Sequence, residues 1–498
     1  MTKNNGLKSF ALVAAVFLVL SWLRLDPGSS NDQALTTNAG RSAETTEDDV
    51  VEEETATADD PTLGTADGST SSNDPTKPGA RTATTQAGAT LVDPKGLECN
   101  RTKNGGATDT GVTATRIKLA TTAVLDGPAK SLLEDSPVAM KAVIDKVNKA
   151  GGVCGRLLDL KVDNDAFNAS DGLRIIRNYI AEGYFALPVV PSAEGLGSAI
   201  DSGEISKAKI PVIGTDGMRK EQYGEPYVWP VASATVTSMR VMAKYGYNNR
   251  NARRFAIVYD DKYKFGKEGK DAFVKQVEDL GGTVQSVTAL NPDLPSYSSE
   301  IQKFNGTSDC GIEAGASKCD MVALLLLPDT AAKWLKGQPE KAKLYTAGAQ
   351  TLFTDRFAQD CVQYYTKSCE GFAIWTGYNP PIGQLASLPD VAAYVNDVKS
   401  VKSSIDVTNQ FVEGAYLGMT VFVDALKKVG PNLTRERLKQ VMDSMTFNST
   451  LASTLTWSPG KHSANVRSQS FEMTTSGGTF RGWTREPSGF ILDPAHGG

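Results

Sequence analysis

From Gly111 onward, short apolar runs alternate with amphipathic helical patterns, and this alternation limits the possible folds more than any other feature. Phe255–Tyr259 and Met321–Leu327 are apolar along almost their whole length, as strands buried on both faces are. Ser170–Glu182 and Gln410–Val429 carry apolar residues at helical spacing. Buried strands that alternate with helices indicate parallel sheets covered on both faces. The sequence therefore predicts an α/β fold.

The N-terminus carries an apolar run, Ser9–Leu25, preceded by Lys3 and Lys8. This pattern is typical of a secretion signal or of a single-pass anchor. No small-x-small cleavage site follows the apolar core closely, so an uncleaved anchor is favoured and a cleaved signal is the alternative. The lysines predict that residues 1–8 are cytoplasmic and that the rest of the chain lies outside the membrane.

Residues 26–95 differ in composition from the rest of the chain. The segment is rich in Thr, Ser, Ala and acidic residues, and it contains no Phe, Trp or Tyr. Between Asp26 and Asp93 there are 14 Asp and Glu against 3 Lys and Arg. Such a segment cannot bury enough apolar surface to offset its ordering entropy. We expect a disordered acidic stalk between the membrane and the folded part.

The chain has 6 cysteines, an even number, and all of them follow the stalk. Their spacing does not match zinc-binding Cys pairs, and export favours disulfides over free thiols. The sequence leaves the connectivity open. We expect three disulfides: Cys99–Cys154, Cys310–Cys319 and Cys361–Cys369.

Motifs for catalysis or cofactor binding are missing from the sequence. No Gly-x-Gly-x-x-Gly run follows the first strand, and no Walker, Gly-x-Ser-x-Gly or His-Glu-x-x-His motif occurs. The only histidines are His462 and His496, too few for a site that needs several histidines. The net charge of −5 gives no sign of a nucleic-acid groove. We expect no cofactor, no metal, no nucleic-acid partner and no catalytic residues; a secreted α/β enzyme is a remote alternative.

An ordered series of segments resembles the type I periplasmic binding proteins, the family of the leucine/isoleucine/valine-binding proteins of ABC transporters. No single motif is decisive, and the likeness covers about residues 111–490. The segments that carry it are TTAVLDGPAK (121–130), NKAGGVCGR (148–156), FALPVVPSAEGLGSAI (185–200), KIPVIGTDG (209–217), FAIVYDDKYKFGKEGKDAF (255–273) and LTWSPGKHSANVRSQSFEM (455–473).

The resemblance implies two Rossmann-like lobes joined by a three-segment hinge. On that basis the first lobe comprises residues 96–232 and 351–452, the second comprises residues 233–350 and 453–490, and residues 491–498 form a tail. It also implies an extracytoplasmic protein that captures a small molecule, such as an amino acid or an amide, for the permease of an ABC importer. A membrane-tethered sensor of the same fold, uncoupled from transport, is the alternative.

In open α/β sheets, ligands bind beyond the carboxyl ends of the strands. This rule, applied to the loops after the expected strands, selects the candidate ligand-binding residues Asp126, Ser192, Ala193, Glu194, Thr215, Asp216, Tyr263, Phe265, Asp329 and Gln350.

The resemblance implies roles for some of these residues. Ser192 and Thr215 would hold a ligand carboxylate, and Asp329 would hold an ammonium group. Phe265 stands where relatives often have a tyrosine that closes over the ligand. Structural roles compete: Ser192 and Asp329 also fit as helix N-caps, Phe265 as core, and Asp126 and Asp216 as turn residues.

Overall fold

The computed structural model of the chain describes residues 91–92, 98–306, 310, 312–313, 316–338, 345–365 and 369–496. The predicted anchor at residues 9–25 lies outside these residues, as does the predicted stalk at 26–95 apart from residues 91–92. In the described part of the chain, no helix combines the length and apolar character needed to cross a membrane.

The first lobe is built on a parallel sheet with the order β4-β3-β5-β6-β7. One bridge between Leu119 and Ala186 joins the β3–β4 pair to the other three strands. The strands are β3 (Arg116–Ala123), β4 (Leu157–Asn164), β5 (Leu187–Pro188), β6 (Val212–Ile213) and β7 (Val228–Trp229). The helices of this lobe are α1 (Lys130–Leu133), α2 (Ser136–Lys149), α3 (Ala169–Ala181), α4 (Ala193–Asp201), α5 (Glu204–Ala208), α11 (Pro389–Val401), α12 (Gln410–Val429) and α13 (Arg435–Met442).

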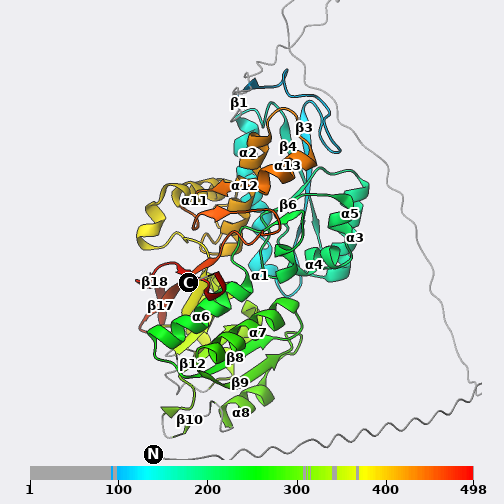
Figure 1. The fold of residues 1–498 in the computed structure, drawn as a ribbon. Helices are drawn as coiled ribbons and strands as arrows, with labels where there is room; N and C mark the ends of the chain where they lie inside the picture. The colour runs from blue at the N-terminus through cyan, green and yellow to red at the C-terminus, as the bar shows by residue number, and fades with distance from the viewer. Residues whose placement is uncertain are drawn as a thin grey trace, which may run out of the picture. The chain divides into compact units, whose positions relative to one another are not determined.

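The second lobe is built on a mixed sheet with the order β18-β17-β14-β13-β12-β8-β9, and β19 pairs with β17. Its strands are β8 (Arg254–Asp260), β9 (Thr283–Leu290), β12 (Met321–Leu325), β13 (Tyr345–Gly348), β14 (Ala373–Thr376), β17 (Arg467–Ser476), β18 (Thr479–Arg485) and β19 (Ile491–Leu492). Its helices are α6 (Thr235–Asn249), α7 (Lys264–Asp279), α8 (Ser298–Gly306), α9 (Pro328–Lys336) and α10 (Asp355–Tyr365). Elements of the two sheets gather in two separate groups in Figure 1. The α/β fold predicted from the alternating patterns is confirmed.

Three further pairs of two-residue strands and short 3-10 turns complete the described elements. The pairs are β1 (Leu91–Val92) with β2 (Glu98–Cys99), β10 (Ile312–Glu313) with β11 (Ala316–Ser317), and β15 (Thr446–Phe447) with β16 (Leu455–Thr456), all antiparallel. The 3-10 turns include η1 (Lys220–Tyr223) and η2 (Gln350–Leu352).

The strand pairing divides the chain differently from the expected boundaries. Residues 351–452 were expected in the first lobe, but β14 pairs with β13 and with β17 in the second sheet. Residues 453–490 were expected in the second lobe, but β16 pairs with β15 beside α13. The chain therefore crosses between lobes after β14 and again before β17, because hydrogen bonding to neighbouring strands fixes where each short apolar run belongs.

Three crossing segments join the lobes, and Asn465 ties them together. Its amide Nδ2 donates to the carbonyl oxygen of Gly377 at 3.0 Å and to that of Val231 at 3.4 Å. Ser233 forms a parallel bridge with Asn465. A Cβ on Gly377 would lie 2.4 Å from the Ser233 hydroxyl, so the segments pack closely at a position where only glycine fits. The three-segment hinge expected from the resemblance is present.

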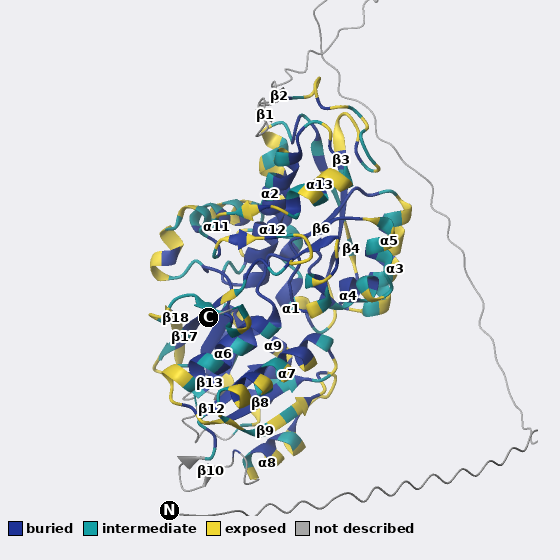
Figure 2. Cartoon of the chain, in the orientation of Figure 1, coloured by how far each residue is buried: buried dark blue, intermediate teal, exposed yellow. Residues whose placement is uncertain are grey.

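The core of each lobe follows from burial of the strands between helices. Figure 2 shows buried ribbon in the sheets and exposed residues on the outer helices. β12 is buried at every position, as its apolar sequence predicts. The structure also pairs Cys99 with Cys154, Cys310 with Cys319, and Cys361 with Cys369.

Candidate functional site

A small cavity of about 20 Å³ lies where the two lobes and the crossing segments meet. Most of its lining comes from the first lobe: the loops after β5 and β6, and the start of α12. The second lobe contributes Gln350, which follows β13, and the crossing segments contribute Ala232 and Tyr378. The full lining is Val189, Pro191, Gly214, Thr215, Asp216, Ala232, Gln350, Tyr378, Gln410, Phe411, Gly414 and Ala415.

Two glycine contacts bring α12 against this site. Gly214 has φ +88°, and a Cβ there would lie 2.5 Å from Gly418 Cα, so the loop after β6 touches the helix backbone. A Cβ on Gly414 would lie 2.7 Å from the hydroxyl of Tyr378. Asn409 starts the helix by accepting a hydrogen bond from the Phe411 N–H at 3.0 Å. The first turn of α12 therefore forms one wall of the cavity.

Asp216 is the one carboxylate in the cavity lining. Its Oδ1 accepts hydrogen bonds from Gln222 Nε2 at 3.0 Å and from the Met218 N–H at 3.1 Å. Its Oδ2 is buried and has no partner among the described residues. Burial raises the pKa of Asp216 to about 7. Thr215 donates its hydroxyl proton to Gln222 Oε1, so its oxygen faces other groups only as an acceptor.

On the opposite wall, two glutamines link the lobes. Gln410 Nε2 donates to the backbone carbonyl of Gln350, and Thr376 Oγ1 donates to Gln410 Oε1 at 2.6 Å. The side-chain oxygen of Gln350 is buried without a hydrogen-bond partner in the described chain. The contact between Gln350 and Gln410 therefore holds the second lobe against the start of α12.

A second carboxyl group lies next to this wall. Glu413 on α12 is fully buried, and neither of its carboxyl oxygens has a partner among the described residues. Burial raises the pKa of Glu413 well above its ordinary value. Burial is the largest cause that raises the pKa of Tyr378, and the nearby charges of Glu413 and Asp216 raise it further. Tyr378 thus lies near enough to both buried acids for their charges to raise its pKa.

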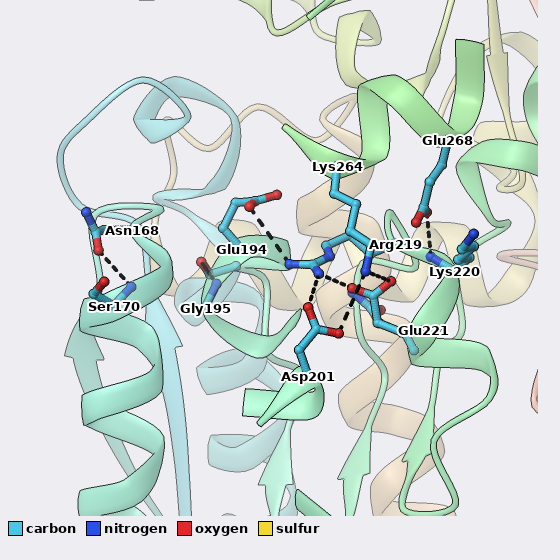
Figure 3. A network of polar contacts seen from close by, with 12 residues as sticks. Asn168, Ser170, Glu194, Gly195, Asp201, Arg219, Lys220, Glu221, Lys264 and Glu268 are labelled. Atoms are coloured by element: carbon cyan, nitrogen blue, oxygen red, sulfur yellow. Dashed lines mark hydrogen bonds and ion pairs between the residues drawn. The ribbon is translucent and has the colours of Figure 1, made fainter. Parts of the chain in front are cut away.

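Charged residues join the lobes at the edge of the interface, in the network of Figure 3. Arg219, nearly buried, pairs with Asp201 at 2.9 Å and also contacts Glu221. Lys264, at the start of α7 in the second lobe, reaches Glu221 at 3.1 Å and Asp201 at 3.7 Å. These contacts link the two lobes directly.

Three further contacts belong to this network. The Lys220 N–H donates to Glu268 on α7 at 2.9 Å. A Cβ on Gly197 would lie 2.0 Å from Arg219 Nη1, so the guanidinium rests on α4 where only glycine leaves room. Glu194 lies 3.9 Å from Arg219, and burial raises the pKa of Glu194.

Aromatic rings cover the interface between the network and the hinge. Phe167 of the first lobe lies 5.2 Å from Tyr263 of the second, edge to face, and Tyr263 stacks on Phe265 at 5.6 Å. All three rings are buried in an apolar cluster that includes residues of both lobes. The lobes therefore share an apolar contact as well as ion pairs.

A comparison with protein families matches the sequence model of the periplasmic binding protein family to residues 116–478. The chain belongs to this family. A comparison with curated protein sequences found no match.

Solved structures of periplasmic binding proteins share the fold. A fatty acid ABC transporter substrate-binding protein from Thermomonospora curvata is 18% identical with a TM-score of 0.62, over 80% of this chain and 97% of that one. A solute-binding protein from R. palustris, in complex with 4-hydroxybenzoate, is 13% identical with a TM-score of 0.63, over 76% and 97%. A leucine-binding protein from Thermotoga maritima is 14% identical with a TM-score of 0.60, over 76% and 99%.

The cavity of this periplasmic binding protein brings together three of the residues selected from the sequence, Thr215, Asp216 and Gln350. Tyr263 and Phe265 lie in the aromatic contact between lobes and do not line the cavity.

The remaining selected residues lie elsewhere. Ser192 accepts from the Gly195 N–H at 3.4 Å and caps α4, which is its structural alternative. Ala193 is buried under the aromatic interface, and Glu194 faces Arg219. Asp126 and Asp329 are exposed and lie outside the lining. Asp329, the residue expected to hold an ammonium group, therefore does not reach this cavity, because it lies in the exposed part of the first turn of α9.

Sequence reasoning missed the contributions of α12 and of the crossing segments: Ala232, Tyr378, Gln410, Phe411, Gly414 and Ala415. The signal that was available is Asn409, an N-cap in front of the longest helical pattern. Residues were selected at strand ends, and α12 does not directly follow a strand of the first sheet, so its residues were not selected.

Proposed function

We propose that this protein is the substrate-binding component of an ABC importer and captures a small solute in the cavity between its lobes. The observation that carries this proposal is the cavity lining, which combines the carboxyl ends of β5 and β6, the start of α12 and Gln350 of the second lobe. Membership of the periplasmic binding protein family supports a solute-binding role outside the cytoplasm.

Capture requires the lobes to part. A cavity of about 20 Å³ has room for about one water molecule, so a larger solute enters only when the second lobe moves away. The three crossing segments supply the hinge, and the ion pairs and aromatic rings of the interface stabilise the closed form. The ligand then shifts an equilibrium between open and closed forms, and the closed form docks on the permease.

The ligands named for the structural neighbours differ in chemistry: a fatty acid, 4-hydroxybenzoate and leucine. We infer that the shared fold leaves the choice of ligand to the residues of each cavity. We also propose that residues 9–25 anchor the chain to the membrane and that residues 26–95 form the stalk, so that the binding lobes lie outside the cell membrane.

A thermal-shift screen of the purified full chain against amino acids, amides, amines and small acids tests the binding role. A ligand at 100 times its dissociation constant raises the unfolding free energy by about 2.7 kcal/mol, a readily measured shift in midpoint. Failure of every compound, with no small molecule found by mass spectrometry in protein purified from its host, would refute the proposal. Recovery of the bound compound unchanged after incubation would support binding without turnover.

A sensor without a transporter is the second candidate, favoured by the length of the predicted stalk. Deletion of the gene distinguishes the two roles. For an importer component, uptake of the radiolabelled ligand falls; for a sensor, uptake is unchanged and the transcriptional response to the ligand is lost.

A further inference from the structure

Two buried side-chain oxygens of the cavity lining, Asp216 Oδ2 and Gln350 Oε1, lack hydrogen-bond partners among the described residues. Asp216 Oδ1 is occupied by Gln222 and by the backbone of Met218, while Oδ2 is buried and unpartnered. Asp216 is only 7% exposed, and it lines the cavity. The hydroxyl of Thr215 already donates its hydrogen bond to Gln222 Oε1, so it can only accept one from a ligand. A buried carboxylate oxygen without a donor costs free energy unless a bound group supplies one.

Gln350 adds a polar group from the opposite lobe. Its side-chain oxygen is buried and unpartnered among the described residues, and the residue is 3% exposed. Rotation of the amide by half a turn would present its NH₂ instead. Asp216 is therefore the fixed acceptor of the cavity, and Gln350 contributes a polar side chain from the second lobe.

In the described lining a ligand carboxylate would meet the phenol hydroxyl of Tyr378 but no positively charged side chain. None of the lining residues in the described chain is Lys, Arg or His. The positive charge that acts on Asp216 is that of Arg219, which pairs with Glu194, Asp201 and Glu221. Glu413 is fully buried near Tyr378 but does not line the cavity, and it supplies no positive charge either.

The helix start in the lining does not reverse this balance. The Phe411 N–H is already bonded to the Asn409 side chain, and the N–H groups of Val412 and Glu413 are bonded to the Asn409 carbonyl. The side chain of Ser192 likewise occupies the Gly195 N–H at the start of α4. These backbone donors are therefore not available to an anion.

We propose that the cavity selects a ligand through nitrogen-bound hydrogen-bond donors, an alkyl ammonium or a primary amide group, held by the carboxylate of Asp216, and discriminates against ligands that present only a carboxylate. This inference rests on the proposed solute-binding function and names the ligand class for the same cavity. Thr215 acts as a second acceptor, and Gln350 closes over the ligand from the second lobe.

Isothermal titration calorimetry of the full chain with matched probes tests the inference. Isobutylamine, isobutyramide and isobutyrate share one carbon skeleton, and benzylamine, benzamide and benzoate share another. We expect the amine or the amide of at least one skeleton to bind at least tenfold more tightly than its carboxylate. The variant Asp216→Asn removes the negative charge at the same volume, and we expect amine binding to weaken at least tenfold.

Asp159→Asn is the matched control, since Asp159 lies on β4 with its side chain 53% exposed and pairs with Arg116 away from the cavity. It should leave binding unchanged. Preferential binding of the carboxylates would overturn the inference and leave the proposed function standing, and so would unchanged amine binding in Asp216→Asn. If no probe binds and no compound copurifies, both fail. Should Asp216→Asn not fold, the ranking of probes on the unmodified chain decides.

Discussion

The two lobes contribute unequally to the cavity. The first lobe supplies two strand-end loops, the start of α12 and the buried acid Asp216, whereas the second supplies Gln350. At the edge of the interface the second lobe contributes more. Lys264 of the second lobe pairs with Glu221 of the first, and Tyr263 of the second lobe packs against the ring of Phe167 of the first. If the proposed function holds, we expect the first lobe to determine which ligand is recognised and the contacts of the second lobe to determine how firmly the cavity is closed.

The largest expected effect tests the contact that shapes the first-lobe wall. Gly214→Ala places a Cβ 2.5 Å from Gly418 Cα at φ +88°, so backbone strain and overpacking combine. We expect the free energy of unfolding, measured by urea titration, to fall by about 3 kcal/mol. Gly106→Ala is the control, because Gly106 has φ +75° but nothing within 4 Å of the added Cβ. Its expected loss is about 1 kcal/mol, and equal losses would show that the wall contact contributes nothing.

The second prediction compares a buried acid in each lobe. Burial raises the pKa of Asp216 in the first lobe and of Asp260 in the second to about 7, from an ordinary value of 3.8. Between these values the folded chain holds protons that the unfolded chain has lost, so stability falls as pH rises from about 4 to about 7. Either Asp→Asn variant should reduce that fall by on the order of 2 kcal/mol, measured by urea unfolding at several pH values.

Only one of these two variants should alter binding. Asp216 lines the cavity and Asp260 does not. Asp260 lies in the second lobe, where its Oδ2 accepts a hydrogen bond from the Leu327 N–H at 2.7 Å. A change of ligand affinity in Asp260→Asn as large as in Asp216→Asn would break the division between the lobes. The titratable or charged neighbours of Asp216 are Glu194, Arg219, Tyr223 and Tyr378. Those of Asp260 are Asp261, Tyr263, Tyr297 and Lys333.

The third prediction concerns closure. Phe167→Ala removes a ring that packs on Tyr263 across the interface, and an edge-to-face pair is worth about 1 kcal/mol. We expect the affinity for whichever solute binds to weaken about fivefold, because the closed form becomes less populated. Phe304→Ala is the control: that ring is equally buried, at 5%, but packs on Trp334 within the second lobe. It should lower stability and leave the affinity unchanged.

The smallest effect belongs to the ion pairs. Lys264→Ala breaks the contacts to Asp201 and Glu221 between lobes, while Lys262→Ala breaks a 2.8 Å pair with Asp293 within one lobe. Exposed pairs contribute little, so we expect Lys264→Ala to weaken ligand affinity about twofold at low salt. The difference should vanish in 1 M NaCl, where screening is strong. If Lys262→Ala weakens the ligand affinity as much as Lys264→Ala does, the ion pairs between the lobes do not contribute to closure.

The sequence predicted the α/β fold and α12 because their apolar patterns are local. Thr215 and Asp216 were found because they follow a strand directly. The wall formed by Gln410 and Phe411 could not be found in that way, since it depends on a contact between segments about two hundred residues apart in the chain. β14 was misassigned for a similar reason: Ala373–Thr376 is buried at all four positions and fits either sheet until its partners are known.

The crossing segments have a mechanical consequence. Because Asn465 bonds to both of the other segments, we expect the three segments to bend together. Opening would then be a rotation about a single axis, with little independent twisting or sliding of the lobes. Spin labels placed on α3 and α7 would therefore report two distance populations that exchange as the solute is added, with no intermediate spread.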